Sequence, residues 1–189
     1  FDMVICPGGS GSRQAAALEE EGREVVKQFV EAGGGYVGIC AGAFLAASNY
    51  SWSLGISNHK TFCETVDVQG IGRKSMWFRG GSAPVTMELT DEGRKILGDF
   101  EGVFEVRYQN GPIMSPMGRE GLGNFRSLSH FRSEVSKYKP QEGTMVNTPA
   151  VIIGEYGNGR VLCISPHPES TDALNRLVQN AVRWTARRR

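Results

Sequence analysis

Residues 34–47 read GGYVGICAGAFLAA, and this stretch decides the fold. The run Gly34 to Val37 is short and apolar, which is typical of a buried strand. The run Ala43 to Ala47 is rich in residues that favour a helix. Cys40 lies at the corner between them, with a glycine two positions away on each side, so the turn is tight and only small neighbours fit. The stretch therefore predicts a strand, a sharp elbow and a helix.

A cysteine at such an elbow has a chemical use. The following helix directs its N-terminal N–H groups and the positive end of its dipole at the sulfur, which favours the thiolate. The arrangement is the cysteine counterpart of the serine nucleophile elbow. The alternative is a cysteine that acts only as a small apolar core residue, because free cysteine is among the most buried residue types.

A second polar feature, near the C-terminus, favours the chemical interpretation. Val161 to Ile164 predicts a compact apolar strand, which is followed by the loop SPHPE at 165–169. Ligands of doubly wound sheets bind beyond the carboxyl ends of the strands, so His167 and Cys40 are expected at one sheet edge. The imidazole can take the thiol proton, and Glu169 can orient the ring. We therefore predict a catalytic triad of these three side chains rather than an ordinary surface loop.

The remaining pattern fits an α/β domain. Met3 to Cys6 predicts a strand, and Ala15 to Ala32 has the apolar spacing of a helix after a glycine-rich loop at 7–12. This strand–helix–strand unit implies parallel pairing with the strand before Cys40. Gly157-Asn158-Gly159 indicates a hairpin turn. The other expected elements are strands at 85–89, 103–108, 151–156 and 160–164, helices from Thr90 and over 174–182, and an irregular insertion at 49–82.

Length and composition are those of a globular domain. Of the 189 residues, 40% are hydrophobic and 22% are charged, and the formal net charge is +1. This balance indicates neither nucleic acid nor a membrane surface as a partner, and no apolar run is long enough to span a membrane. The four cysteines form no C-x-x-C pair, and Cys6 and Cys163 are expected to be inert core residues. His59, Cys63 and Glu64 could act as metal ligands, but the cluster has no second half, so a polar loop is favoured and no metal is predicted. No cofactor is predicted either.

The G-x-C-x-G elbow, followed far downstream by His-Pro-Glu, resembles the class I glutamine amidotransferase superfamily. Within it, residues 33–47, the Cys-Pro-Gly-Gly-Ser-Gly loop at 6–11 and the segment 108–112 resemble the biotin-protein ligase N-terminal domain family. The resemblance implies a three-layer, doubly wound, flavodoxin-like α/β sandwich, with residues 1–189 as a single domain. It also implies a preceding strand–helix–strand portion that this chain lacks. The strand at 3–6 is therefore expected to be central, and the compartment cannot be read from this sequence.

The resemblance also implies roles for the first glycine-rich loop, which would face the nucleophile. The backbone N–H groups of Gly9 and Ala41 would form an oxyanion hole. A phosphate-binding loop is disfavoured because the G-x-x-x-x-G-K-[ST] spacing is absent, and a plain turn is the remaining alternative. Further substrate contacts are expected from Gly8, Phe44, Tyr108 and Asn110.

The chemistry implied by the resemblance is acyl transfer through a thioester. Cys40 would attack a small-molecule carboxamide or γ-glutamyl-type substrate, and water or an amine would resolve the intermediate. Known glutaminases carry Gln or Met two residues after the second glycine of the elbow, where this chain has Phe44, so glutamine is expected to be a poor substrate. An amidase, hydrolase or amidotransferase is the leading expectation. A non-catalytic ligand-binding or regulatory domain is the alternative.

Overall fold

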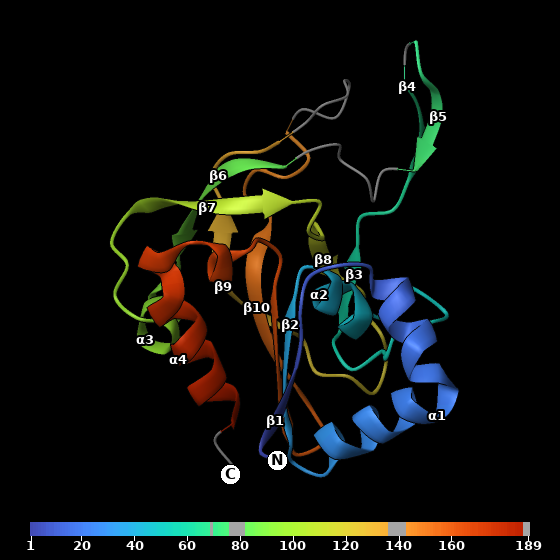
Figure 1. Ribbon diagram of the computed structural model, residues 1–189. Coiled ribbons are helices and arrows are strands. Elements are labelled where there is room, and N and C mark those ends of the chain that lie inside the picture. Colours follow the sequence, from blue (N-terminus) through green and yellow to red (C-terminus); the bar gives the residue numbers. More distant parts are fainter. Residues whose placement is uncertain (69, 76–81, 136–142, 187–189) are drawn as a thin grey trace.

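The computed structural model describes residues 1–68, 70–75, 82–135 and 143–186. Within these residues a seven-stranded sheet has the order β1-β2-β11-β10-β9-β6-β7. Helices α1 and α2 cover one face of the sheet, and α3 and α4 cover the other (Figure 1). This confirms the predicted three-layer α/β sandwich. The strands are β1 (Met3–Cys6), β2 (Gly35–Ile39), β6 (Ser82–Leu89), β7 (Val103–Gln109), β9 (Arg126–Phe131), β10 (Pro149–Tyr156) and β11 (Gly159–Ile164).

The helices are α1 (Gly11–Glu31), α2 (Ala41–Ala46), α3 (Asp91–Leu97) and α4 (Asn175–Ala186). Two 3-10 turns, Pro168–Ser170 and Asp172–Leu174, precede α4. Helix α1 begins earlier than predicted because Ser10 caps it, accepting from the Arg13 N–H at 3.4 Å. The helix bends at Glu19, where φ is 57°. Helix α3 begins after Thr90 as predicted, because the threonine hydroxyl accepts from the Gly93 N–H at 3.0 Å.

The apolar side chains form one core on each face of the sheet. Tyr36 of β2 and Val161 of β11 are register partners, and both pack with Leu45 on the side of α1 and α2. The next pair along the same strands, Val37 and Leu162, belongs to the core on the side of α3 and α4. Because successive strand residues face opposite sides, continuously apolar strands can supply both cores at once.

Strand β1 lies at the edge of the described sheet and pairs in parallel with β2. The expectation that residues 3–6 are central includes a neighbouring strand from a preceding portion, and it stays a prediction. Among the described strands only β2 pairs with β1, so the other edge of β1 has no strand beside it. Ile5 of β1 is 47% exposed.

The predicted insertion at 49–82 contains short strands. Strand β3 (His59–Thr61) pairs with β8 (Met114–Pro116). Strands β4 (Thr65–Val68) and β5 (Gly72–Ser75) form a hairpin that projects from the body (Figure 1). Residues 69 and 76–81 of this region lie outside the described part.

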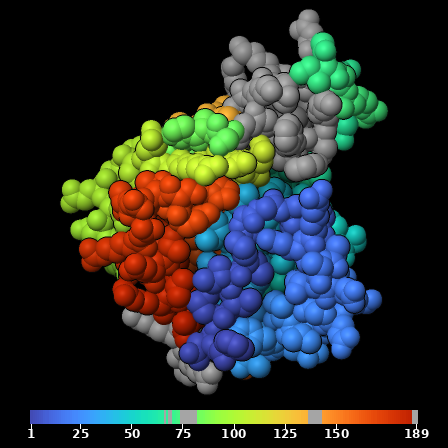
Figure 2. Space-filling view, viewed as in Figure 1, coloured from blue at the N-terminus to red at the C-terminus, as the bar shows by residue number. Residues whose placement is uncertain are grey.

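The three strands β1, β2 and β11 run parallel, so their carboxyl ends lie together at one end of the strands. The sheet curls, and β6 and β7 cross above these strand ends in Figure 1. In Figure 2 the N-terminal segment (blue) and the C-terminal segment (red) lie side by side, with the yellow-green β7 region across the top. The curl therefore brings the end of β7 to the loops that follow the parallel strands.

Candidate active site

Cys40 occupies a sharp elbow between β2 and α2. Its φ is 50° and its ψ is −97°, which is outside the usual backbone regions of an L-residue. Its N–H donates to the Ile164 carbonyl at 2.8 Å. A Cβ added to Gly38 would lie 2.5 Å from the Gly42 carbonyl, and one added to Gly42 would collide with the Cys6 carbonyl. Small residues are therefore required on both sides of the cysteine, as the sequence pattern indicates.

His167 follows β11 and is held from three directions. Its N–H donates to the Arg107 carbonyl at 2.8 Å, and its ring Nδ1 donates to the Glu169 carboxylate at 2.7 Å. The ring also lies against the first glycine-rich loop, since a Cβ on Gly8 would approach its Cε1 to 2.6 Å. Ring atom Nε2 is buried and has no hydrogen-bond partner among the described residues. Because Nδ1 donates to the carboxylate, Nε2 is the ring atom that can exchange a proton with the thiol.

The charge state of His167 depends on its neighbours. The Cys40 side chain and then the Glu169 carboxylate raise the pKa of the imidazole to about 9, against burial, which lowers it. No direct hydrogen bond joins thiol and imidazole in this resting geometry. The Cys40 Sγ instead lies 3.5 Å from the Gln109 carbonyl, to which it donates. Catalytic hydrogen bonds often shorten only when substrate is bound, so a thiol and an imidazole that are not yet hydrogen-bonded can still exchange a proton.

A cavity of about 710 Å³ opens over the sulfur. Six of the residues expected at the site line this cavity, and the sequence does not predict the other residues that line it. Ala41 and Glu169 do not line it; Ala41 begins α2, and Glu169 stands behind His167. The expected lining residues are Cys40, His167, Gly8, Gly9, Phe44 and Asn110, and the others are Ser10, Gly11, Ser12, Tyr50, Trp52, Arg107 and Gln109.

Tyr108 is not a lining residue. It is fully buried, its hydroxyl donates to the Gly111 carbonyl at 2.7 Å, and its ring meets Phe131 edge-on at 5.9 Å. Because β7 alternates between two faces, the neighbours Arg107 and Gln109 line the cavity instead. The alternation of buried Val106 and Tyr108 with exposed residues is the sequence signal that could have placed them.

His59 supports the elbow from behind. It is fully buried, with Nδ1 2.9 Å from the Ser57 hydroxyl and Nε2 3.2 Å from the Ala43 carbonyl. Burial lowers its pKa to about 4, so the ring is neutral near pH 7. No group of three His, Cys, Asp or Glu side chains suited to a metal occurs in the described ranges. Among the helices described here, none has the length and apolar character needed to cross a membrane.

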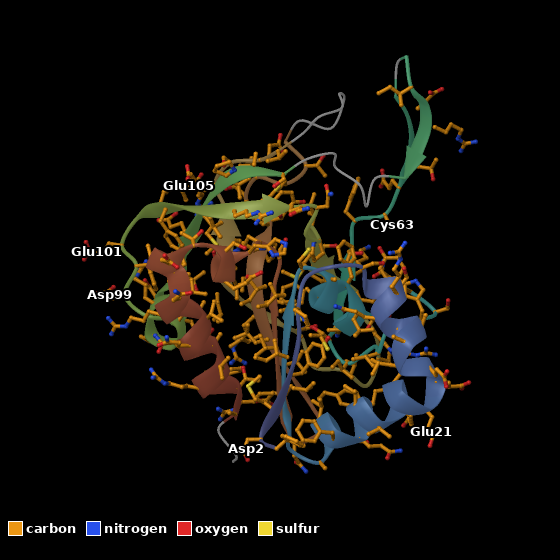
Figure 3. The ribbon with its side chains drawn as sticks, viewed as in Figure 1. Asp2, Glu21, Cys63, Asp99, Glu101 and Glu105 are labelled. Carbon is orange, nitrogen blue, oxygen red and sulfur yellow. The ribbon has the colours of Figure 1, made fainter. Side chains whose placement is uncertain are left out.

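The other three cysteines lie in different surroundings. Cys163 is fully buried, and burial raises the pKa of its thiol. Cys6 is only partly buried, unlike the core residue that the sequence predicts, and burial again raises its pKa. Cys63 is exposed in the connection between β3 and β4 (Figure 3). Cys40 is thus the cysteine that lies beside an imidazole and lines the cavity.

Comparisons with known proteins agree with this architecture. The model of the family described as "Biotin-protein ligase, N terminal" matches residues 1–186. A biotin–protein ligase of Schizosaccharomyces pombe is 21% identical over 173 residues, which cover 88% of this chain and 25% of that protein. The chain thus spans about a quarter of this curated relative.

Solved structures show the same fold. A glutamine amidotransferase superposes with a TM-score of 0.61 at 21% identity, covering 98% of this chain and 79% of that one. A ThuA-like protein from Bacteroides uniformis superposes with a TM-score of 0.60 at 17% identity, covering 98% and 69%. At these identities the likeness concerns the fold, which is that of class I glutamine amidotransferases.

Proposed function

The chain belongs to the biotin-protein ligase N-terminal family, and on this premise we propose that it carries out cysteine-dependent acyl chemistry at Cys40. One observation carries the proposal: the thiol stands at a sharp elbow beside an imidazole that a carboxylate orients at 2.7 Å, and it lines a cavity. Nucleophile, base and orienting acid are the three parts that such chemistry requires.

In the proposed reaction, His167 Nε2 takes the thiol proton and the Cys40 sulfur attacks the carbonyl carbon of an amide. The carbon–sulfur bond forms, and the developing oxyanion accepts hydrogen bonds from the N–H groups of Gly9 and Ala41. The carbon–nitrogen bond then breaks, and the leaving amine takes the proton from the imidazolium. Water or a second amine releases the acyl group by the same steps in reverse order.

The proposed substrates are small carboxamides or γ-glutamyl-type amides other than free glutamine. Phe44 lines the cavity where known glutaminases carry Gln or Met, and it replaces a flexible or polar side chain with an aromatic ring. A ring at this place favours an apolar portion of substrate over the charged backbone of glutamine.

The test combines turnover with a trapped intermediate. Purified chain is incubated with a panel of γ-glutamyl and simple amides, and ammonia or amine release is measured beside intact-mass spectra. We expect an acyl adduct on wild type that is absent from Cys40→Ala and slowed in His167→Ala. If no member of the panel yields product or adduct on Cys40, the catalytic proposal is wrong.

A second candidate is an accessory domain that binds a protein substrate of a biotin–protein ligase. The family and the curated relative support it, because their names describe transfer of biotin to a protein. Binding of a biotin-accepting protein by the Cys40→Ala variant, with wild-type affinity and no adduct in either protein, would favour this candidate.

A further inference from the structure

One wall of the cavity is aromatic and fixed in place. Phe44, Tyr50 and Trp52 all line it. The rings of Tyr50 and Trp52 stack with centroids 4.6 Å apart and an interplanar angle of 14°, and Phe44 lies 6.4 Å from Tyr50. The Tyr50 hydroxyl is bound to the Thr61 hydroxyl at 2.7 Å, so its hydrogen-bonding group is already engaged. This wall therefore offers flat apolar surface at little cost in conformational entropy.

The packing around Gly11 keeps this wall close to the first loop. A Cβ on Gly11 would lie 3.1 Å from the Trp52 ring and 3.1 Å from Phe44 Cβ. The glycine thus lets the start of α1 approach both aromatic residues. The wall, the loop and the elbow form one preorganised surface rather than separate mobile pieces.

A different part of the lining carries positive charge. Arg107 projects from the exposed face of β7, and its guanidinium donates to the Gln109 side-chain oxygen at 2.8 Å. That amide is neutral, and no ion pair of Arg107 occurs within the described ranges. None of the described residues that line the cavity is Asp or Glu. Glu105, two residues earlier on β7, does not line the cavity.

We infer that this cavity selects acyl compounds that combine a flat apolar group with an anionic group, the flat group lying on Phe44, Tyr50 and Trp52 and the anion paired with Arg107. The inference rests on the proposed acyl chemistry at Cys40 and adds the class of substrate. Guanidinium groups bind carboxylates and phosphates through paired N–H donors, and an arginine without an acidic partner retains that capacity. Aromatic rings supply the complementary surface for the remainder of the molecule.

The test uses activated aryl esters whose acyl parts differ in charge. The probes are the mono-4-nitrophenyl esters of terephthalic and isophthalic acid, each paired with its neutral ester in which a carboxamide replaces the free carboxylate. Attack by Cys40 forms the carbon–sulfur bond, breaks the ester carbon–oxygen bond and releases 4-nitrophenolate, which is followed by absorbance. Rates are divided by those of a small free thiol to remove intrinsic reactivity. Intact mass locates the acyl group.

We expect at least one anionic ester to acylate Cys40 about tenfold faster than its neutral partner, as a charge-assisted hydrogen bond allows. Arg107→Gln should bring that ratio close to one, mainly by slowing the anionic ester. Arg73→Gln, an equal change of charge on the exposed β4–β5 hairpin, is the matched control and should preserve the ratio. Trp52→Leu should slow both members of a pair.

The outcomes separate the two proposals. Equal rates for anionic and neutral esters, or a ratio that Arg107→Gln leaves unchanged, would overturn the substrate class while Cys40 acylation still stands. Absence of acylation by all four esters, with Cys40→Ala indistinguishable from wild type, would instead overturn the acyl chemistry. Higher salt should reduce the ratio, because Arg107 is exposed and its attraction for the carboxylate is screened.

Discussion

The proposed chemistry depends on the position of His167, and three contacts of different kinds fix its ring. Glu169 accepts from Nδ1, the Arg107 carbonyl accepts from the backbone N–H, and Gly8 leaves room for the ring edge. The first contact sets the tautomer and the other two set the position. Proton transfer depends on both the tautomer and the position of the ring. A change in any of the three contacts should therefore slow proton transfer from the Cys40 thiol.

Gly8→Ala is expected to push the imidazole away from Cys40, since its Cβ would lie 2.6 Å from His167 Cε1. Misplacement of a catalytic group costs roughly 10²-fold in rate. Acylation of Cys40 by an activated ester measures the loss. The control is Gly123→Ala, where an added Cβ meets nothing within 4 Å and φ is not positive. Equal rates for the two variants would contradict the positioning role of Gly8.

Cys40 is expected to be the cysteine that iodoacetamide alkylates first near neutral pH. His167 stands beside it, whereas burial raises the pKa of Cys6 and Cys163. His167→Ala should slow labelling by at least about tenfold, because the base is lost. Glu169→Gln should slow it less, because the carboxylate acts through the imidazole. Peptide mapping after limited labelling gives the order, and faster labelling of exposed Cys63 would count against the assignment.

At the scale of elements, the elbow is a joint between β1, β2 and α2. Gly42 lies so close to the Cys6 carbonyl that no side chain fits, and Gly38 lies against Gly42. Both contacts are with backbone, which cannot rotate away as a side chain could. Helix α2 can therefore stay close to β1 only while these positions remain glycine.

Gly42→Ala is expected to lower the free energy of unfolding by roughly 1–3 kcal/mol, the usual cost of overpacking a close contact. Urea unfolding followed by circular dichroism measures the change. Gly154→Ala in β10 is the matched control, because its Cβ would meet nothing within 4 Å. A loss in Gly42→Ala no larger than that of the control would show that β1 and α2 can separate without cost.

The sequence predicts the elements of the site better than the residues on them. The hairpin of β10 and β11 follows from Gly157, whose φ is 57°, and the elbow follows from the spacing of its glycines. Those signals are local. Family likeness predicts Tyr108 at the site, but its side chain lies on the face of β7 that packs into the core. Its neighbours Arg107 and Gln109 line the cavity instead. A shift of one residue along a strand reverses every side chain, so family likeness without register misplaces them.

At the scale of the whole molecule, the curl of the sheet is what the sequence does not predict. Arg107 and Gln109 reach the cavity because β7, at the opposite edge from β1, crosses above the ends of the parallel strands. Twist and coiling accumulate over seven strands, and no short stretch encodes them. The sequence also does not place Tyr50 and Trp52 at the cavity, because residues 49–82 carry no regular strand or helix pattern.

The stability of the whole molecule should depend on His59 in acid. Its pKa is lowered to about 4 in the folded chain, below the ordinary value near 6.5. Above that ordinary value neither state binds the proton. As pH falls from 6.5 towards 4, only the unfolded chain binds it, so stability falls, by about 3 kcal/mol in total.

His59→Gln should therefore lose less stability than wild type between pH 7 and pH 4, as urea unfolding at each pH would measure. His130→Gln is the comparison, because burial also lowers the pKa of His130, which is only partly buried. It should remove less of the pH dependence. Identical pH profiles for wild type and His59→Gln would contradict the buried neutral state.

The backbone of Cys40 also constrains how this sequence can drift. A conformation of φ 50° and ψ −97° costs a residue with a side chain on the order of 1–3 kcal/mol, and glycine adopts it more easily. A lineage in which the sulfur had lost its use could recover that energy through a single substitution to glycine. Cysteine at this position thus carries a backbone cost that glycine would avoid. Homologues that have abandoned the chemistry should be recognisable by a third glycine in the elbow.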